Sequence, residues 1–137
     1  YQDDAFGKDG LRSAEAALKK HGLKPVAIAT VQRNSAQITP ALRVLEKAQP
    51  NAVIIISTYV SSAALSKALL QKNIKARIMN VSFVGTRALE NSLPVGQANG
   101  IGVSQVVPFP CVLSKTTETY LFRCLHLSQI LIRGARG

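Results

Sequence analysis

The sequence has few of the residues that usually carry catalysis or metal binding. It contains no tryptophan, two cysteines and two histidines, and aromatic residues make up 5% of its 137 positions. Cys111 and Cys124 have neither the paired spacing of a zinc site nor the C-x-x-C spacing of a redox motif, and His21 and His126 lie far apart in the sequence. No apolar run approaches the roughly 20 residues that span a bilayer. We therefore expect no metal, no cofactor and no membrane span.

Acidic residues are scarce as well. Seven Asp and Glu stand against 17 Lys and Arg, which gives a formal net charge of +10. Such a charge favours acidic partners or anionic surfaces through long-range attraction. The basic residues are scattered, however, and Lys19 and Lys20 are the only adjacent pair. Since no aromatic pattern typical of an RNA-binding domain accompanies them, the sequence predicts a solvated basic surface and no nucleic-acid partner.

An apolar run that ends abruptly at two hydroxyl residues and a tyrosine is the most informative feature. Val53 to Ile56 lack the alternation of a half-exposed strand, so they predict a parallel strand covered on both faces. Ser57, Thr58 and Tyr59 would then follow its carboxyl end. Ligands of open α/β sheets bind at that edge, because the following helices direct their N-terminal amides into it. These three residues are therefore a candidate ligand-binding wall.

Helix and strand patterns alternate along the rest of the chain, with short links between them. The length of 137 residues and a hydrophobic fraction of 47% are enough for one domain with a real core. The expected order is helix 6–21, strand 25–31, helix 39–48, strand 53–56, helix 61–71, strand 76–80, helix 85–91 and strand 100–107. This alternation predicts an α/β fold, with a parallel sheet flanked by helices and joined by right-handed crossovers.

Several phrases together, in their order and spacing, resemble the periplasmic solute-binding proteins of the leucine/isoleucine/valine type. The phrases are residues 1–10, the block at 39–42 before the strand at 52–56, the exit at 57–59, and residues 100–110. The likeness implies that residues 1–110 form most of the second (C-terminal) lobe of a type I periplasmic binding protein, a Rossmann-like lobe that is incomplete. Residue 1 would lie at the end of the opening strand, as in a fragment, and residues 107–110 would approach a hinge. Residues 111–137 do not resemble the family and form a divergent tail.

The resemblance also implies which residues contact the solute. Phe6 takes the place of a family aromatic that packs against the ligand, and packing at the start of the helix explains this residue equally well. Tyr59 matches an aromatic at the exit of its strand and is the strongest single candidate. Ser57 and Thr58 would donate hydroxyl groups to the ligand, with capping of the next helix as the favoured alternative for Thr58.

One departure from the family concerns the loop at residues 80–84. Amino-acid binders of the family place a carboxylate there that holds the ammonium group of the ligand, whereas this sequence has Ser82 or Phe83 at that position. A buried cation without a charged partner is strongly destabilised. The resemblance implies a solute that is an amino acid or a small carboxylate or aromatic compound. Within this class we expect a neutral or carboxylate-bearing solute with an apolar or aromatic body, rather than a branched-chain amino acid.

The resemblance implies a receptor in the periplasm that binds a small-molecule solute together with a first lobe and delivers it to the membrane permease of an ABC importer. It implies no enzymatic activity. An effector-binding lobe of a regulator or signalling receptor is an alternative on the same scaffold. A flavodoxin-like enzyme using Asp3 and Asp4 is a weaker alternative, because no phosphate loop or nearby histidine accompanies them. Since a lone lobe leaves apolar surface uncovered, we also expect self-association through the incomplete lobe or the tail.

Overall fold

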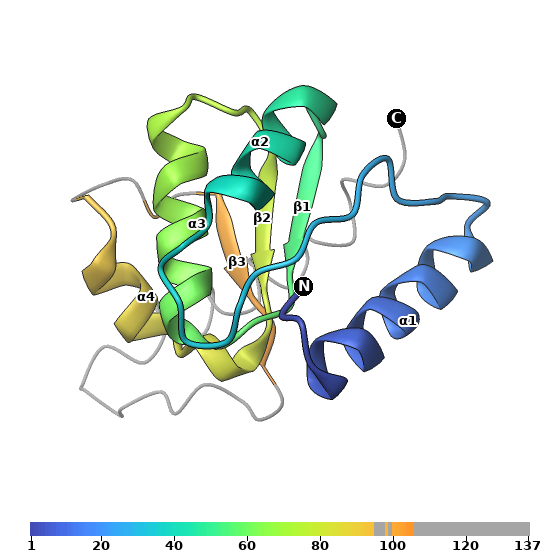
Figure 1. Ribbon diagram of the computed structural model, residues 1–137, viewed down its shortest axis with the longest axis horizontal. Coiled ribbons are helices and arrows are strands. Elements are labelled where there is room, and N and C mark those ends of the chain that lie inside the picture. Colours follow the sequence, from blue (N-terminus) through green and yellow to red (C-terminus); the bar gives the residue numbers. More distant parts are fainter. Residues whose placement is uncertain (95–97, 99, 106–137) are drawn as a thin grey trace, which may run out of the picture. The chain divides into compact units, whose positions relative to one another are not determined.

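The computed structural model describes residues 1–94, 98 and 100–105, which belong to one compact unit, Tyr1–Val106. The expected tail at residues 111–137, with both cysteines, and the hinge approach at residues 107–110 lie outside the described residues. The elements follow in the order α1 (Ala5–Lys20), α2 (Thr39–Ala48), β1 (Ala52–Ile55), α3 (Tyr59–Gln71), β2 (Arg77–Asn80), the 3-10 helix η1 (Ser82–Val84), α4 (Thr86–Ser92) and β3 (Ile101–Val103) (Figure 1).

The three strands form a parallel sheet in the order β1-β2-β3, as the sequence predicts. The register places Val53 of β1 opposite Ile78 of β2, and Asn80 of β2 opposite Val103 of β3. Each pair of neighbouring strands is joined through a helix, α3 or α4, which is the connection that parallel pairing requires. Because all strands run in the same direction, their carboxyl ends lie at one edge of the sheet.

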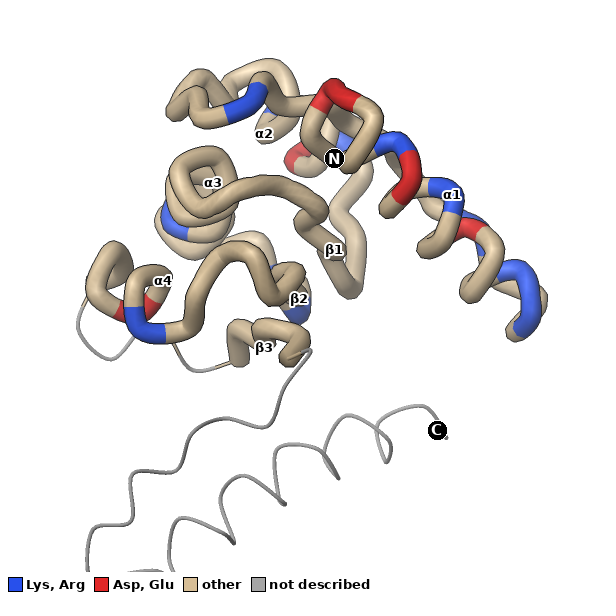
Figure 2. The backbone as a smooth tube through the Cα atoms, turned by 90° about the horizontal axis from the view of Figure 1, so that it is seen from below, with Lys and Arg blue, Asp and Glu red and all other residues tan. Residues whose placement is uncertain are grey.

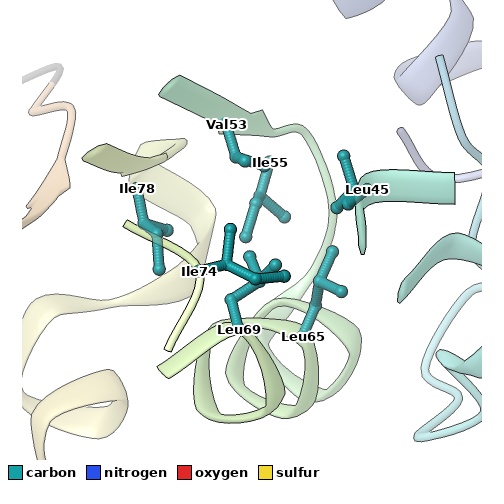
Figure 3. Packing of buried hydrophobic residues seen from close by; sticks show 7 residues of the cluster. All are labelled: Leu45, Val53, Ile55, Leu65, Leu69, Ile74 and Ile78. Atoms are coloured by element: carbon teal, nitrogen blue, oxygen red, sulfur yellow. The ribbon is translucent and has the colours of Figure 1, made fainter. Parts of the chain in front are cut away.

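The hydrophobic core lies between one face of the sheet and α3 (Figure 3). Val53 and Ile55 of β1 and Ile78 of β2 face the helix, where Leu65 and Leu69 meet them. Ile74 and Leu45 complete this cluster. Leu69 has no exposed surface, and Ile78 is 1% exposed. A second cluster, made of Ala63, Val84, Leu89 and Leu93, joins α3 to α4 and η1.

The prediction that the apolar run of β1 is covered on both faces is wrong for the described residues. Burial alternates along the strand, and the side chain of Ile54 is 50% exposed. A strand in a parallel sheet is buried on both sides only when helices cover both faces. In this structure α3 covers the face that carries Val53 and Ile55, and the opposite face of β1 keeps its apolar side chain in solvent.

The expected strand at residues 25–31 is reduced to a single parallel bridge between Val31 and Gln2. Val26 is 77% exposed and Ile28 is 48% exposed, so their β-branched side chains are not packed into the core of the described part of the chain. β-propensity reflects packing against neighbouring strands, which explains why the pattern alone does not produce a strand here.

The helices end at the residues that the sequence marks as stops. After α1, Gly22 adopts a φ of 70° and its N–H donates to the Lys19 carbonyl, while Leu23 N–H donates to the Leu18 carbonyl. These two hydrogen bonds form a Schellman cap, which favours glycine at the left-handed position. Asn73 plays the same part after α3 with a φ of 52°. α3, however, starts two residues earlier than expected, so Tyr59 is its first residue rather than part of a loop.

Lysine and arginine residues are spread over all four helices and β2 rather than gathered on one face (Figure 2). This distribution agrees with the scattered pattern in the sequence and provides no basic stripe within the described part. Among the described residues, no helix has the length and apolar character needed to cross a membrane.

Truncating Leu69 tests the core between α3 and the sheet. We expect Leu69→Ala to lower the free energy of unfolding by about 2–5 kcal/mol, because it removes a fully buried side chain and leaves a cavity. Chemical denaturation followed by circular dichroism measures this change. The matched control Val44→Ala, at a position that is 39% exposed on α2, should change stability by about 0.5 kcal/mol or less. Equal losses in both variants would contradict this account of the core.

Candidate functional site

All candidate ligand-binding residues lie at the carboxyl edge of the sheet. Ser57, Thr58 and Tyr59 follow β1, and Ser82 and Phe83 follow β2 in η1. Phe6 reaches the same edge because its segment leaves a short extended piece at Gln2, which runs parallel to Val31 and donates its N–H to the Ile56 carbonyl at 2.8 Å. Three segments therefore meet at this edge: the one after Gln2, the one after β1 and the one after β2.

Phe6 and Phe83 come together although 77 positions separate them in the sequence (83 − 6). Their ring centroids are 5.1 Å apart and the ring planes meet at 79°, the edge-to-face arrangement that aromatic quadrupoles favour. Phe6 is half-buried in the first turn of α1, whereas Phe83 is 71% exposed on η1. The pair therefore offers a fixed apolar surface to solvent, and a solute with an apolar body would cover it.

Tyr59 is 38% exposed and is fixed by α4. Its hydroxyl group donates to the Ala88 carbonyl oxygen at 3.2 Å, which ties the start of α3 to the helix after β2. Because the hydroxyl proton is already used in this bond, the tyrosine can offer its ring and an acceptor oxygen to a ligand.

Ser57 is buried and Thr58 is half-buried, and both direct their hydroxyl groups to oxygens of the protein. Ser57 has no exposed surface, and its hydroxyl lies 3.4 Å from Oε1 of Gln2. Thr58 donates its backbone N–H to the same oxygen at 3.2 Å, and its hydroxyl lies 3.0 Å from Oε1 of Gln2 and 2.9 Å from Oδ1 of Asn34. The favoured prediction that Thr58 caps α3 is wrong: it occupies the N-cap position but makes no side-chain capping bond, because its hydroxyl turns to these amides instead.

Gln2 is the residue of this edge that the sequence did not reveal. It is 1% exposed, and its Nε2 donates to Oδ2 of Asp4 at 2.5 Å. Asp4 is the N-cap of α1, where its Oδ1 accepts the N–H of Gly7 at 2.9 Å. A Cβ at Gly7 would overlap the Gln2 carbonyl, so the missing side chain lets the helix approach this closely. No sequence pattern marks Gln2, because its partners come from distant segments.

The two aspartates are both engaged in holding α1. The N–H of Gly7 and, to a smaller extent, the side-chain amide of Gln2 hold the pKa of Asp4 below its ordinary value. Asp3 forms an ion pair with Lys8 at 3.0 Å. These partners account for the aspartates as parts of a helix start. Within residues 1–94, 98 and 100–105, no group of three or more His, Cys, Asp and Glu side chains could hold a metal ion.

The loop after β2 has no acidic side chain between residues 80 and 84. Ser82 is half-buried and begins η1, and Val84 is 2% exposed and anchors the loop in the core. Asn80, the last residue of β2, is 2% exposed, and neither polar atom of its side chain has a hydrogen-bond partner among the described residues. The two candidate side chains of this loop, Ser82 and Phe83, are both uncharged.

Comparison with known proteins identifies similar chains. A family model described as "Periplasmic binding protein" matches residues 1–121. Among solved structures, a possible leucine/isoleucine/valine-binding protein from Rhodopirellula baltica SH 1 is 33% identical with a TM-score of 0.72, and covers 89% of this chain. A substrate-binding periplasmic protein from Ralstonia solanacearum is 27% identical with a TM-score of 0.70, and covers 74%.

The matched region amounts to about a third of those relatives, 34% of the Rhodopirellula chain and 29% of the Ralstonia chain. No curated protein matches the sequence significantly.

The acid response of the α1 N-cap follows from the lowered pKa of Asp4. A carboxyl group of this kind contributes stability that is present above the unfolded pKa, 3.8, and is lost as the pH falls through the lower folded value. We expect the wild type to melt at a higher temperature than Asp4→Asn at pH 7, and the difference to shrink below roughly pH 4. Thermal unfolding by circular dichroism measures it.

Asp9→Asn is the control, because it removes a carboxylate from an exposed ion pair with Arg12 on the same helix. Exposed ion pairs contribute little to stability, so this variant should melt close to the wild type at pH 7. A gap between wild type and Asp4→Asn that stays constant from pH 7 to pH 3 would contradict the assignment.

Proposed function

Since the chain belongs to the periplasmic binding protein family, we propose that it forms one lobe of an extracytoplasmic solute receptor serving an ABC importer. The observation that carries this proposal is the aromatic pair Phe6 and Phe83, which stands exposed at the carboxyl edge of a parallel sheet. That edge is where open α/β sheets bind ligands. The family and the similar structures are those of binding proteins, which agrees with recognition without bond chemistry.

The proposed mechanism is enclosure between two lobes. A solute that contacts both lobes binds the closed arrangement more tightly than the open one, so it shifts the population toward closure. The edge described here supplies one of the two contacting surfaces. A lobe by itself makes only part of these contacts, and we therefore expect weak solute binding by the 137-residue chain alone.

The proposed solute is neutral or carries a carboxylate, and has an apolar or aromatic body. Phe6, Phe83 and the ring of Tyr59 supply apolar surface, and Ser82 supplies a hydroxyl. Asp4 is bonded to Gly7 and Gln2 at the start of α1, which leaves it poorly placed to neutralise an ammonium group. The net charge of +10 does not oppose the approach of an anion.

Removal of the Phe83 ring tests the site. In the two-lobed protein that contains this sequence, we expect Phe83→Ala to weaken solute binding roughly 10- to 100-fold, because most of the apolar contact with the ring is lost. Its effect on the melting temperature should be small, since the side chain is 71% exposed in the lobe. Titration calorimetry with a panel of carboxylates, neutral aromatics and zwitterionic aliphatic amino acids measures the affinities.

Leu23→Ala is the matched control, because Leu23 is 59% exposed but lies beyond the far end of α1. It should leave affinity unchanged. Tight binding of aliphatic amino acids without binding of carboxylates or neutral aromatics would reject the proposed solute class. Unchanged affinity in Phe83→Ala would reject the proposed site.

A further inference from the structure

We propose that Gln2 is the positioning residue of the carboxyl edge, and that its buried side-chain amide sets the placement of the segment bearing Phe6 relative to the segment bearing Tyr59. This inference rests on the proposed function of that edge as a ligand-binding surface. The backbone of Gln2 is held on both sides, by the bridge to Val31 and by the N–H bond to the Ile56 carbonyl. Its side chain therefore starts from a fixed point inside the edge.

The chemistry of the partners determines the orientation of the amide. The N–H of Thr58 can only donate, and it lies 3.2 Å from Oε1. The carboxylate of Asp4 can only accept, and it lies 2.5 Å from Nε2. The reversed orientation would place two donors against each other at one end and two acceptors at the other, so one arrangement satisfies all partners.

Each end of the amide leads to one aromatic residue. Through Nε2, Gln2 holds the carboxylate that caps α1 at Gly7, in the same turn as Phe6. Through Oε1, it holds Ser57 and Thr58, which lead directly into Tyr59 at the start of α3. Among the described residues, Gln2 is thus the one side chain bonded both to the N-cap of α1 and to the turn before α3.

Only an uncharged group with a donor at one end and an acceptor at the other fits this position beside an ionised Asp4. A glutamate would keep the acceptor for Thr58 but would place a second carboxylate against Asp4, and like charges at that distance repel. A leucine or methionine would leave the buried hydroxyl of Ser57 and the N–H of Thr58 without this acceptor.

The same geometry suggests a compensating exchange. In the double variant Gln2→Glu/Asp4→Asn the carboxylate and the amide change places, so the asparagine donates to the glutamate while its own oxygen still accepts the Gly7 N–H. Asparagine is as good an N-cap as aspartate. The donor and acceptor pattern is thereby restored although both residues are changed. If the two substitutions only lowered general stability, the double variant would not recover the behaviour of the wild type.

Backbone hydrogen exchange in the 137-residue chain, followed by nuclear magnetic resonance, is the first measurement. The amides of Thr58 and Gly7 are direct reporters, because they donate to Gln2 and Asp4, respectively. We expect Gln2→Glu to speed exchange at both amides about tenfold or more, because repulsion between the introduced carboxylate and Asp4 moves the two groups apart and displaces the acceptors of both N–H groups. The double variant should return both to within about threefold of wild type. The control Gln71→Glu, which adds the same charge at the exposed end of α3, should change neither.

Solute affinity of the two-lobed protein is the second measurement, and it should fall with Gln2→Glu and recover in the double variant. Solute binding that is independent of Gln2 would overturn this inference and leave the proposed function standing. Coupled exchange at Thr58 and Gly7 in a protein that binds no solute would reject the function and retain Gln2 as the link between the two segments.

Three results in the exchange experiment would overturn the role of Gln2. They are unchanged exchange at Thr58 in Gln2→Glu, a change confined to one of the two reporter amides, and a double variant no better than the single one. If Gln2→Glu does not fold, the comparison passes to Asp4→Asn, which preserves the N-cap. Faster exchange at Thr58 in that variant, reversed by adding Gln2→Glu, supports the inference, and unchanged exchange contradicts it.

Discussion

The packing of α3 against β1 and β2 is the contact on which the rest of this structure depends. Val53, Ile55 and Ile78 lie on one face of the sheet, and Leu65 and Leu69 close over them. The helix must run back along the sheet to make this contact, so the two strands that it joins have to be parallel. Burial of apolar surface thereby dictates the direction of the strands.

Parallel strands deliver the residues that follow each of them to one edge. The turn after β1, the loop after β2 and the segment after Gln2 all arrive there, and the Phe6 and Phe83 pair shows how residues far apart in the chain meet. The edge is polar beneath and apolar on top. Buried hydroxyls and the Gln2 amide satisfy one another below, whereas the phenylalanine ring of η1 stands in solvent. The buried hydrogen bonds thus hold the backbone of the edge in place, and the exposed ring above them is mostly not covered by other described residues.

The sequence predicts those parts of the fold that local chemistry decides. Helix stops at Gly22 and Asn73 need only a left-handed residue, and the strand at Val53 needs only an apolar run next to a helix stripe. The strand expected around Val26 does not form, because a strand needs a neighbouring strand to pair with and the local pattern of residues does not supply one. The capping role expected for Thr58 fails for a related reason, since a hydroxyl that can cap its own helix is claimed by Gln2, 56 positions away. Networks of this kind leave no periodic signal in a sequence.

Two groups among the exposed apolar side chains differ in origin. Val26, Ile28 and Ile54 are β-branched residues on or beside extended backbone, where a further strand or helix would normally cover them. Phe83 is an aromatic residue on a short 3-10 turn, and its neighbour Val84 anchors that turn in the core. A rigid aromatic held out by a buried neighbour loses little conformational entropy on binding. The first group therefore indicates surface that covering by polypeptide would stabilise, and the second has the properties required by the solute contact that we propose.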